Sequence, residues 1–260
     1  RAKGYTKGKK KTEEVFTLLK RTTTPTTIYK KQKLDRDDVV DINDFDVIAW
    51  IKSEMRVMLD EEIARAVLIG DGRSTASDDK INETNIRPIW TDDDLYSIKY
   101  LTEFETGITE DEEAKAFIKA VIKSRKDYKG SGNPILFTTE DMLTKCLLLE
   151  DKNGRAIYDT EEKLRTALRV SEIITVEAME GAKRLDSTVN KYLDGILVNL
   201  KDYNVGADKG GAINLFDDFD IDYNQMKYLI ETRCSGALVK PKSAIVIEHS
   251  VKTALEAEEE

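Results

Sequence analysis

The segment from residue 44 to residue 75, DFDVIAWIKSEMRVMLDEEIARAVLIGDGRST, constrains the fold more than any other part of the chain. Its apolar side chains recur at steps of three and four residues, which keeps them on one face of an α-helix. They are Val47, Ile48, Ile51, Met55, Met58, Leu59, Ile63, Ala66 and Val67. No helix-breaking residue interrupts this pattern before Gly70, so the segment predicts one long, uninterrupted helix.

Both ends of this helix carry residues that suit them. Asp44 or Asn43 can cap the start, because a side-chain oxygen there accepts a hydrogen bond from a backbone N–H that lacks a partner within the helix. Gly70 suits the left-handed backbone position that follows a helix end. About 26 residues at 1.5 Å each give roughly 39 Å, longer than an ordinary globular helix. We expect a rigid beam on which other elements pack.

The remaining composition narrows the class of protein. A length of 260 residues fits one large domain or two subdomains. No apolar run reaches the roughly 18 residues of a membrane span, and no secretory signal opens the chain, so we expect no membrane partner. Cys146 and Cys234 are expected to be buried free thiols of a reducing compartment. The single histidine, His249, excludes His-based triads and His-rich zinc sites, and is expected at the surface after the last strand.

Charge argues against a nucleic-acid-reading surface. The net charge is −9, whereas a protein that contacts phosphates normally presents a basic face. The exception is the basic N-terminal stretch RAKGYTKGKKK, which we interpret as a solvated, mobile arm, with a nucleic-acid contact as the alternative. The C-terminal EAEEE is expected to be a frayed acidic tail.

Two apolar runs precede the long helix. They span residues 15–19 and 27–29 and flank RTTTPTT, whose Thr and Pro content favours extended backbone or a turn. We predict a protruding two-stranded hairpin with little core of its own, stable only when packed on something else.

The chain after the long helix alternates between helix and strand patterns, which predicts an α+β fold. A loop follows to Trp90. Helices are expected at 110–126, from Glu140 and at 160–169, with a hairpin at LLLEDKNGRAIY whose Asn153 and Gly154 supply positive φ angles. Strands are expected at ILFTT, EIITVEAM, YLDGILVNL, AINLFDDFDIDY, QMKYLIETRCSGALV and SAIVIE.

Candidate ligand motifs are weak. GDGRS at 70 and GSGNP at 130 lack the Gly-Lys-Ser/Thr of a phosphate loop and indicate turns. Residues 151–154 with Glu162 lack the spacing of a calcium loop. Asp218, Asp220 and Asp222 alternate with apolar residues, which predicts a half-buried strand with a wet face; a divalent-cation site is the alternative. Trp50 and Trp90 are interpreted as packing anchors. We therefore assign no catalytic, cofactor-binding or metal residue.

Four motif blocks in order resemble the Hong Kong 97-type major capsid proteins of tailed bacteriophages. They are TIYKKQKLDRDDVVDIND before the long helix, MLDEEIARAVLIGDG at its end, LLLEDKNGRAIY in the middle and YLIETRCSGALVKPKSAIVI near the end. The resemblance covers nearly the whole chain and implies the capsid fold, with a spine helix, a peripheral (P) domain, an axial (A) domain and an extended E-loop.

The resemblance also implies a division of the chain. Residues 1–43 correspond to the E-loop hairpin, and the family's N-terminal arm that precedes it has no counterpart here. Residues 44–92 correspond to the P domain with the spine helix, 93–216 to the A domain, and 217–260 to the returning P-domain strands and the tail.

The function implied is structural: many copies build an icosahedral shell around the double-stranded DNA of a tailed phage, with no enzymatic activity. The expected partners are other copies in pentamers and hexamers, portal and scaffold or protease proteins during assembly, and packaged DNA without sequence-specific contacts. The expected location is the virion capsid, assembled in the host bacterial cytoplasm. An encapsulin-type nanocompartment shell is one alternative, and an acidic enzyme using the carboxylates of the Asp218–Asp222 strand is another.

Some members of this family join subunits by a Lys–Asn isopeptide bond that a Glu assists. Asn224 and Glu231 fit that pattern by position and spacing, and Lys20 matches only with a gap. Cross-linking therefore stays an open alternative, as do the triangulation number, the host, the tail type and any decoration proteins.

Overall fold

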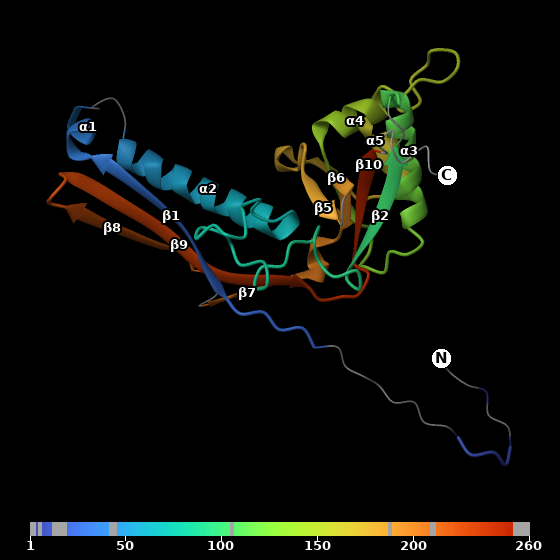
Figure 1. Ribbon diagram of the computed structural model, residues 1–260, viewed down its shortest axis with the longest axis horizontal. Helices are drawn as coiled ribbons and strands as arrows, with labels where there is room; N and C mark the ends of the chain where they lie inside the picture. The colour runs from blue at the N-terminus through green and yellow to red at the C-terminus, as the bar shows by residue number, and fades with distance from the viewer. Residues whose placement is uncertain are drawn as a thin grey trace.

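The computed structural model describes residues 4, 7–11, 20–41, 46–104, 107–186, 189–208 and 212–251. The molecule is elongated and has two lobes (Figure 1). One lobe is a four-stranded sheet under the long helix α2, and the other is a six-stranded sheet with helices α3, α4 and α5. Within the described ranges, no helix is both long and apolar enough to cross a lipid bilayer.

The predicted long helix is confirmed as α2 (Val47–Leu68), a single helix of 22 residues. Its length of about 33 Å follows from 1.5 Å per residue. The cap prediction was wrong: Asp46 is the N-cap, and its Oδ1 accepts the Ala49 N–H at 3.0 Å. Gly70 takes the predicted left-handed position, with φ of 93°, and its N–H donates to the Arg65 carbonyl at 3.0 Å.

One face of α2 is buried against the four-stranded sheet. Its buried side chains are Val47, Ile51, Met55, Leu59, Ala66 and Leu68. Most of these pack with Ile28, Tyr228 and Ile230 from the sheet below. Met58, which the periodicity placed on the buried stripe, is 41% exposed. The predicted stripe is thus confirmed for Val47, Ile51, Met55, Leu59 and Ala66, and the prediction was wrong for Met58.

The four-stranded sheet is organised around β9 (Gln225–Leu238). On one side, β1 (Thr26–Asp35) pairs antiparallel with β9 over its whole length. On the other side, β8 (Asn214–Asp220) and then β7 (Tyr203–Ala207) pair with successive parts of β9, also antiparallel. A short helix α1 (Arg36–Asp41) leads from β1 toward α2.

This pairing differs from the predicted N-terminal hairpin. Its second run, residues 27–29, lies on β1, whose partner is β9. The first run, residues 15–19, lies outside the described residues. A strand with little core of its own is therefore stabilised here by the longest strand of the molecule.

The six-stranded sheet has the order β2, β10, β6, β3, β4, with β5 also paired to β6. Its strands are β2 (Ser97–Phe104), β3 (Ile135–Thr138), β4 (Ile173–Thr175), β5 (Lys183–Asp186), β6 (Val189–Val198) and β10 (Ala244–Val251). Because β10 pairs with β2 and β6, it does not return to the sheet of β9. The expected divisions at residues 93 and 217 therefore do not coincide with the two sheets: β7 and β8 belong with β9, and β10 belongs with the other lobe.

Helices α3 (Glu110–Ser124), α4 (Glu140–Leu147) and α5 (Glu161–Leu168) pack against the six-stranded sheet. Each begins after a threonine at the N-cap position, which can satisfy backbone N–H groups of the first turn. Two short 3₁₀ turns, η1 (Glu177–Met179) and η2 (Leu200–Asp202), complete the lobe. The LLLEDKNGRAIY segment is a turn closed by one bridge, Glu150 to Ala156, in which only Gly154 has positive φ, so the prediction for Asn153 was wrong.

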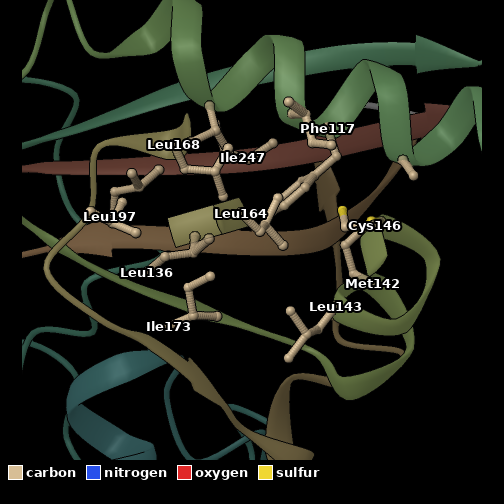
Figure 2. Packing of buried hydrophobic residues seen from close by; sticks show 14 of the residues in the cluster. Phe117, Leu136, Met142, Leu143, Cys146, Leu164, Leu168, Ile173, Leu197 and Ile247 are labelled. Carbon is tan, nitrogen blue, oxygen red and sulfur yellow. The ribbon is translucent and has the colours of Figure 1, made fainter. Parts of the chain in front are cut away.

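The core of this lobe is apolar and closely packed (Figure 2). Side chains from the three helices and the sheet meet there, including Phe117, Leu136, Met142, Leu143, Cys146, Leu164, Leu168, Ile173, Leu197 and Ile247. Both cysteines are buried free thiols, as predicted. A separate cluster with Trp90 and Leu238 lies where the two lobes join.

The loop after α2 is organised by one carboxylate. The Asp71 side chain is fully buried and accepts hydrogen bonds from the Ile81 N–H at 2.7 Å, the Arg73 N–H at 3.1 Å and the Lys80 ammonium at 3.2 Å. Burial alone would raise the pKa of Asp71, but these hydrogen bonds outweigh it and hold the pKa below its usual 3.8.

A depressed pKa makes this contribution to stability dependent on pH. The folded-state pKa of Asp71 lies below its unfolded-state pKa. The stabilisation is therefore fully present when the pH is above the unfolded-state pKa, and it is lost as the pH falls through the folded-state pKa. We expect Asp71→Asn to reduce the free energy of unfolding by about 1–3 kcal/mol at neutral pH. That difference should shrink as the pH drops below 4. Urea unfolding at a series of pH values measures it, with Asp79→Asn on the exposed part of the same loop as the control. A difference that stays constant down to pH 2.5 would contradict the role of the charge.

Candidate functional site

The three alternating carboxylates do not form a metal site. Among the described residues, no group of three or more His, Cys, Asp or Glu side chains is placed to hold a metal ion. Asp218 and Asp220 lie on β8, whereas Asp222 lies in the turn after it. Asp220 pairs with Lys227 of β9, and this hydrogen bond lowers the pKa of Asp220. These carboxylates thus follow one another along the edge of the sheet, and they do not surround a position where a metal ion could bind.

The β8 strand is exposed on both faces, so the prediction of a half-buried strand was wrong. Phe216 and Phe219, which point to opposite faces, are 51% and 38% exposed. Beyond the strand, Ile221 and Tyr223 are exposed as well. The physical reason is that α2 packs mainly on β1 and β9, which leaves β8 outside its cover. Exposed aromatic side chains on an outer strand indicate an interaction surface.

The single histidine is also placed differently from its prediction. His249 lies within β10, and its Nδ1 is 2.7 Å from Oδ1 of Asp194 on β6. Its ring stacks between Phe104 and Tyr192, with centroids 5.0 and 5.1 Å away. Burial raises the pKa of Asp194, and the hydrogen bond with His249 opposes that shift. The pair ties neighbouring strands of one sheet together.

Cys146 does not carry an activated thiol. Burial raises the pKa of Cys146 to about 12, so the thiol is protonated at neutral pH. Since the thiolate is the nucleophile, Cys146 is suited to packing in the core of Figure 2 rather than to covalent catalysis.

A buried ion pair within the six-stranded lobe also holds Trp90, from the segment that connects α2 to β2. Glu248 is 1% exposed; it accepts the Trp90 indole N–H at 2.6 Å, and its two carboxylate oxygens accept from Arg184 Nε at 2.6 Å and Nη2 at 2.9 Å. Trp90 is therefore the packing anchor that the sequence indicated. Trp50, at 55% exposed, is not, and that prediction was wrong.

The residues that precede β1 are held where the two lobes join. Arg21 pairs with the buried Asp92, donates to the Leu238 carbonyl at 2.8 Å and lies 4.1 Å from the centre of the Tyr96 ring. Two residues later, the Thr23 hydroxyl donates to Ser235 at 3.1 Å. These contacts fix residues 21–23 against the joint between the lobes.

A groove of about 840 Å³ runs between α2 and the six-stranded lobe. Its lining is largely apolar and includes Ile28, Met58, Leu68, Phe137, Val176 and Leu200. A volume of this size exceeds what one small side chain fills, and an open apolar lining of this kind suits a protein segment.

The residues of the cross-linking alternative are not brought together within one chain. Asn224 lies in the turn before β9 with φ of 51°, and Glu231 lies seven residues further along the extended strand, roughly 23 Å away. Lys20 is exposed and lies next to the anchored Arg21. Any bond among the three would have to join different copies.

Sequence reasoning missed the two edges of the four-stranded sheet. One is β1, with Lys30, Lys31 and Lys33, and the other is β8, with Asp217, Asp218 and Asp220. The signal was present as the strings KKQK and DDFD. The sequence alone did not show that these charged segments lie on edge strands, whereas the strand pairing does.

Comparisons with known proteins place this geometry in context. The sequence matches no protein-family model and no curated protein sequence. Similar solved structures include a chain of Mycobacterium phage Ogopogo, at TM-score 0.63 and 13% identity over 96% of this chain and 83% of that one. A chain of the capsid of Myoviridae phage XM1 is similar at TM-score 0.59 and 7% identity, over 87% and 74%. A chain of the capsid of an empty GTA particle is similar at TM-score 0.54 and 13% identity, over 86% and 72%.

These likenesses extend over 86–96% of the chain. At such low identity, these likenesses establish the fold alone. The α+β fold is therefore the Hong Kong 97-type capsid fold that the four motif blocks implied.

Proposed function

We propose that this chain is the major capsid protein of a tailed phage or prophage, a structural subunit whose many copies close into an icosahedral shell around double-stranded DNA. The observation that carries the proposal is the fold shared over 87% of the chain with a chain of a phage capsid. The elongated two-lobed shape supports it, because subunits that meet around cyclic axes need a stiff wedge.

Each lobe then has a part in the shell. We assign α2 and the four-stranded sheet to the P domain, and the six-stranded lobe, including β10, to the A domain that surrounds the five-fold and six-fold positions. The E-loop role falls to the residues before β1, since β1 itself is fixed on β9. The partners are thus other copies in pentamers and hexamers, with portal and scaffold or protease proteins during assembly in the host cytoplasm.

Charge supports a container for DNA without sequence-specific contacts. The net charge of −9 disfavours tight adhesion of packaged DNA to the wall. The encapsulin-type shell shares the fold but is not favoured, because the similar chains come from phages and a GTA particle. No arrangement of the described carboxylates argues for the acidic enzyme.

Electron microscopy of negatively stained protein, expressed from its complete reading frame, tests the proposal. We expect closed icosahedral particles whose only essential subunit is this chain, and DNA inside particles purified from the host. A protein that stays monomeric at millimolar concentration, with and without the co-expressed assembly proteins, would overturn it. Particles filled with an enzyme instead of DNA would favour the encapsulin alternative.

A further inference from the structure

Both outer edges of the four-stranded sheet are open among the described strands. The sheet order places β1 at one edge and β8 at the other, with β9 between them. An open edge presents a row of unpaired backbone N–H and C=O groups that can pair with another chain. Half of the β1 side chains and all but one of the β8 side chains are exposed as well. The molecule therefore carries two templates for adding a strand.

The two edges carry opposite charges with identical spacing. The β1 strand reads TIYKKQK from Thr27 to Lys33, and the β8 strand reads NLFDDFD from Asn214 to Asp220. Lysines stand at positions four, five and seven of the first string, and aspartates at the same positions of the second. Lys30, Lys31 and Lys33 form no ion pair with any residue that the structure describes. Asp217 and Asp220 have partners in their own chain, Lys52 and Lys227.

The strand directions fix how two copies would meet. Since β1 and β8 are both antiparallel to β9, they run in the same direction within one chain. When a second copy stands beside the first in the same orientation, its β1 runs parallel to the open edge of β8. A parallel pair keeps residues in step, so a charge spacing that is identical on both strands is matched at every position.

We propose that β8 of one copy and β1 of the adjacent copy form a parallel pair, with Lys31 beside Asp218 and Lys33 beside Asp220. This inference deepens the proposed shell and rests on it, because the edges meet only where copies stand side by side. The contact is heterologous, so each copy uses both edges, and repetition closes a ring when the rotation between copies divides a full turn.

The rest of the register agrees with this pairing. It places Tyr29 beside Phe216, two aromatic side chains that are 57% and 51% exposed in the isolated chain. Both lie on the face opposite α2, since Tyr29 and Asn214 pair with the same residue of β9, Glu231. Aromatic and opposite-charge neighbours stabilise adjacent strands, and like charges destabilise them.

The same charges exclude the other edge contacts. Pairing β1 with β1 would bring lysines together, and pairing β8 with β8 would bring aspartates together. Both arrangements are isologous and place like charges on adjacent strands. The charge pattern therefore selects the heterologous contact and prevents copies from joining in the wrong orientation.

Disulfide trapping tests the pair directly. Two variants, Lys31→Cys and Asp218→Cys, are mixed before assembly and oxidised, both as soluble protein and in particles. Adjacent strands bring the two Cα atoms to about 5 Å, within disulfide range. The native cysteines are buried, so the unmodified chain is the background control. We expect a disulfide-linked dimer in the mixture and none with either variant alone. No dimer in the mixture, or equal dimer with a single variant, would overturn the proposal.

Exchanging the charges of Lys31 and Asp218 tests this contact separately from the formation of a shell. We expect Lys31→Glu or Asp218→Lys alone to raise the concentration needed for assembly on the order of tenfold, and the double exchange to restore it to within about twofold. Lys123→Glu, an exposed lysine on α3, is the matched control. Wild-type particles combined with failure of the exchange to rescue would sink the edge pairing and leave the shell standing. Absence of wild-type particles would instead remove the shell, and the soluble disulfide assay would then decide the pair.

Discussion

Replacing Glu248 by alanine should lower the free energy of unfolding by about 3–5 kcal/mol, the range expected when one partner of a buried ion pair is removed. The Glu248 side chain is almost wholly buried and is the acceptor for the Trp90 indole and for two nitrogens of Arg184. Without it, the guanidinium keeps its charge in a site that is only partly open to water. The loss should appear as a lower midpoint in urea unfolding with little change in slope.

A matched control tests whether the expected loss of stability comes from burial of the carboxylate or from its charge alone. Asp186 also contacts Arg184, at 3.4 Å, and Lys191, at 2.5 Å, but its side chain is 40% exposed, so Asp186→Ala should cost much less than Glu248→Ala. Glu248→Gln should fall between the two, since it retains an acceptor for the indole and loses the charge. Equal losses for Glu248→Ala and Asp186→Ala would show that the buried pair stabilises the fold no more than the exposed contact does.

The long helix was predictable because its signal is local. The three- and four-residue spacing of apolar side chains specifies a helix without reference to the rest of the chain. Its start was misplaced because residues 43, 44 and 46 all carry side chains that can cap a helix, and the sequence alone does not choose among them. The exposure of Trp50 was also readable, since position 50 lies off the apolar stripe that includes Val47 and Ile51.

The placement of β10 was not predictable from its residues. A strand of Ala, Ile and Val packs equally well in either sheet, and the choice is made by pairing with β2 and β6, far away in the sequence. The position of His249 follows from the same pairing. Its partner Asp194 lies 55 residues earlier, and the strand continues three residues past the predicted end at Glu248, which brings His249 inside the sheet.

The edges of the four-stranded sheet show a third kind of limit. Alternation of apolar and acidic residues in β8 predicts one covered face, but only if another element lies over it. Here α2 packs mainly on the neighbouring strands and leaves Phe219, on the face toward α2, exposed. The rule that alternation predicts a half-buried strand therefore fails at β8. Because such failures are expected at functional sites, β8 is a candidate assembly surface.

A proline in the middle of α2 should have the largest effect on assembly. Arg56 lies on the exposed side of the helix, so Arg56→Pro leaves the packed face unchanged. Proline removes the hydrogen bond from residue 56 to the carbonyl of Lys52 and its ring clashes with that carbonyl, which costs about 3 kcal/mol or more and kinks the helix. We expect a lower midpoint of thermal unfolding and, at temperatures where the variant is still folded, few or no closed particles.

The substitution Arg56→Ala isolates the backbone effect. It removes only an exposed ion pair with Asp60 at 4.0 Å, worth at most about 0.5 kcal/mol, and should assemble as the wild type does. A folded Arg56→Pro protein that still builds normal particles would mean that the shell tolerates a bent α2. Subunit shape would then be set by the sheet of β9, because that sheet and α2 both run along the lobe of the four-stranded sheet. Loss of particles with retained circular dichroism would instead show that a straight α2 transmits the geometry of one contact to the next.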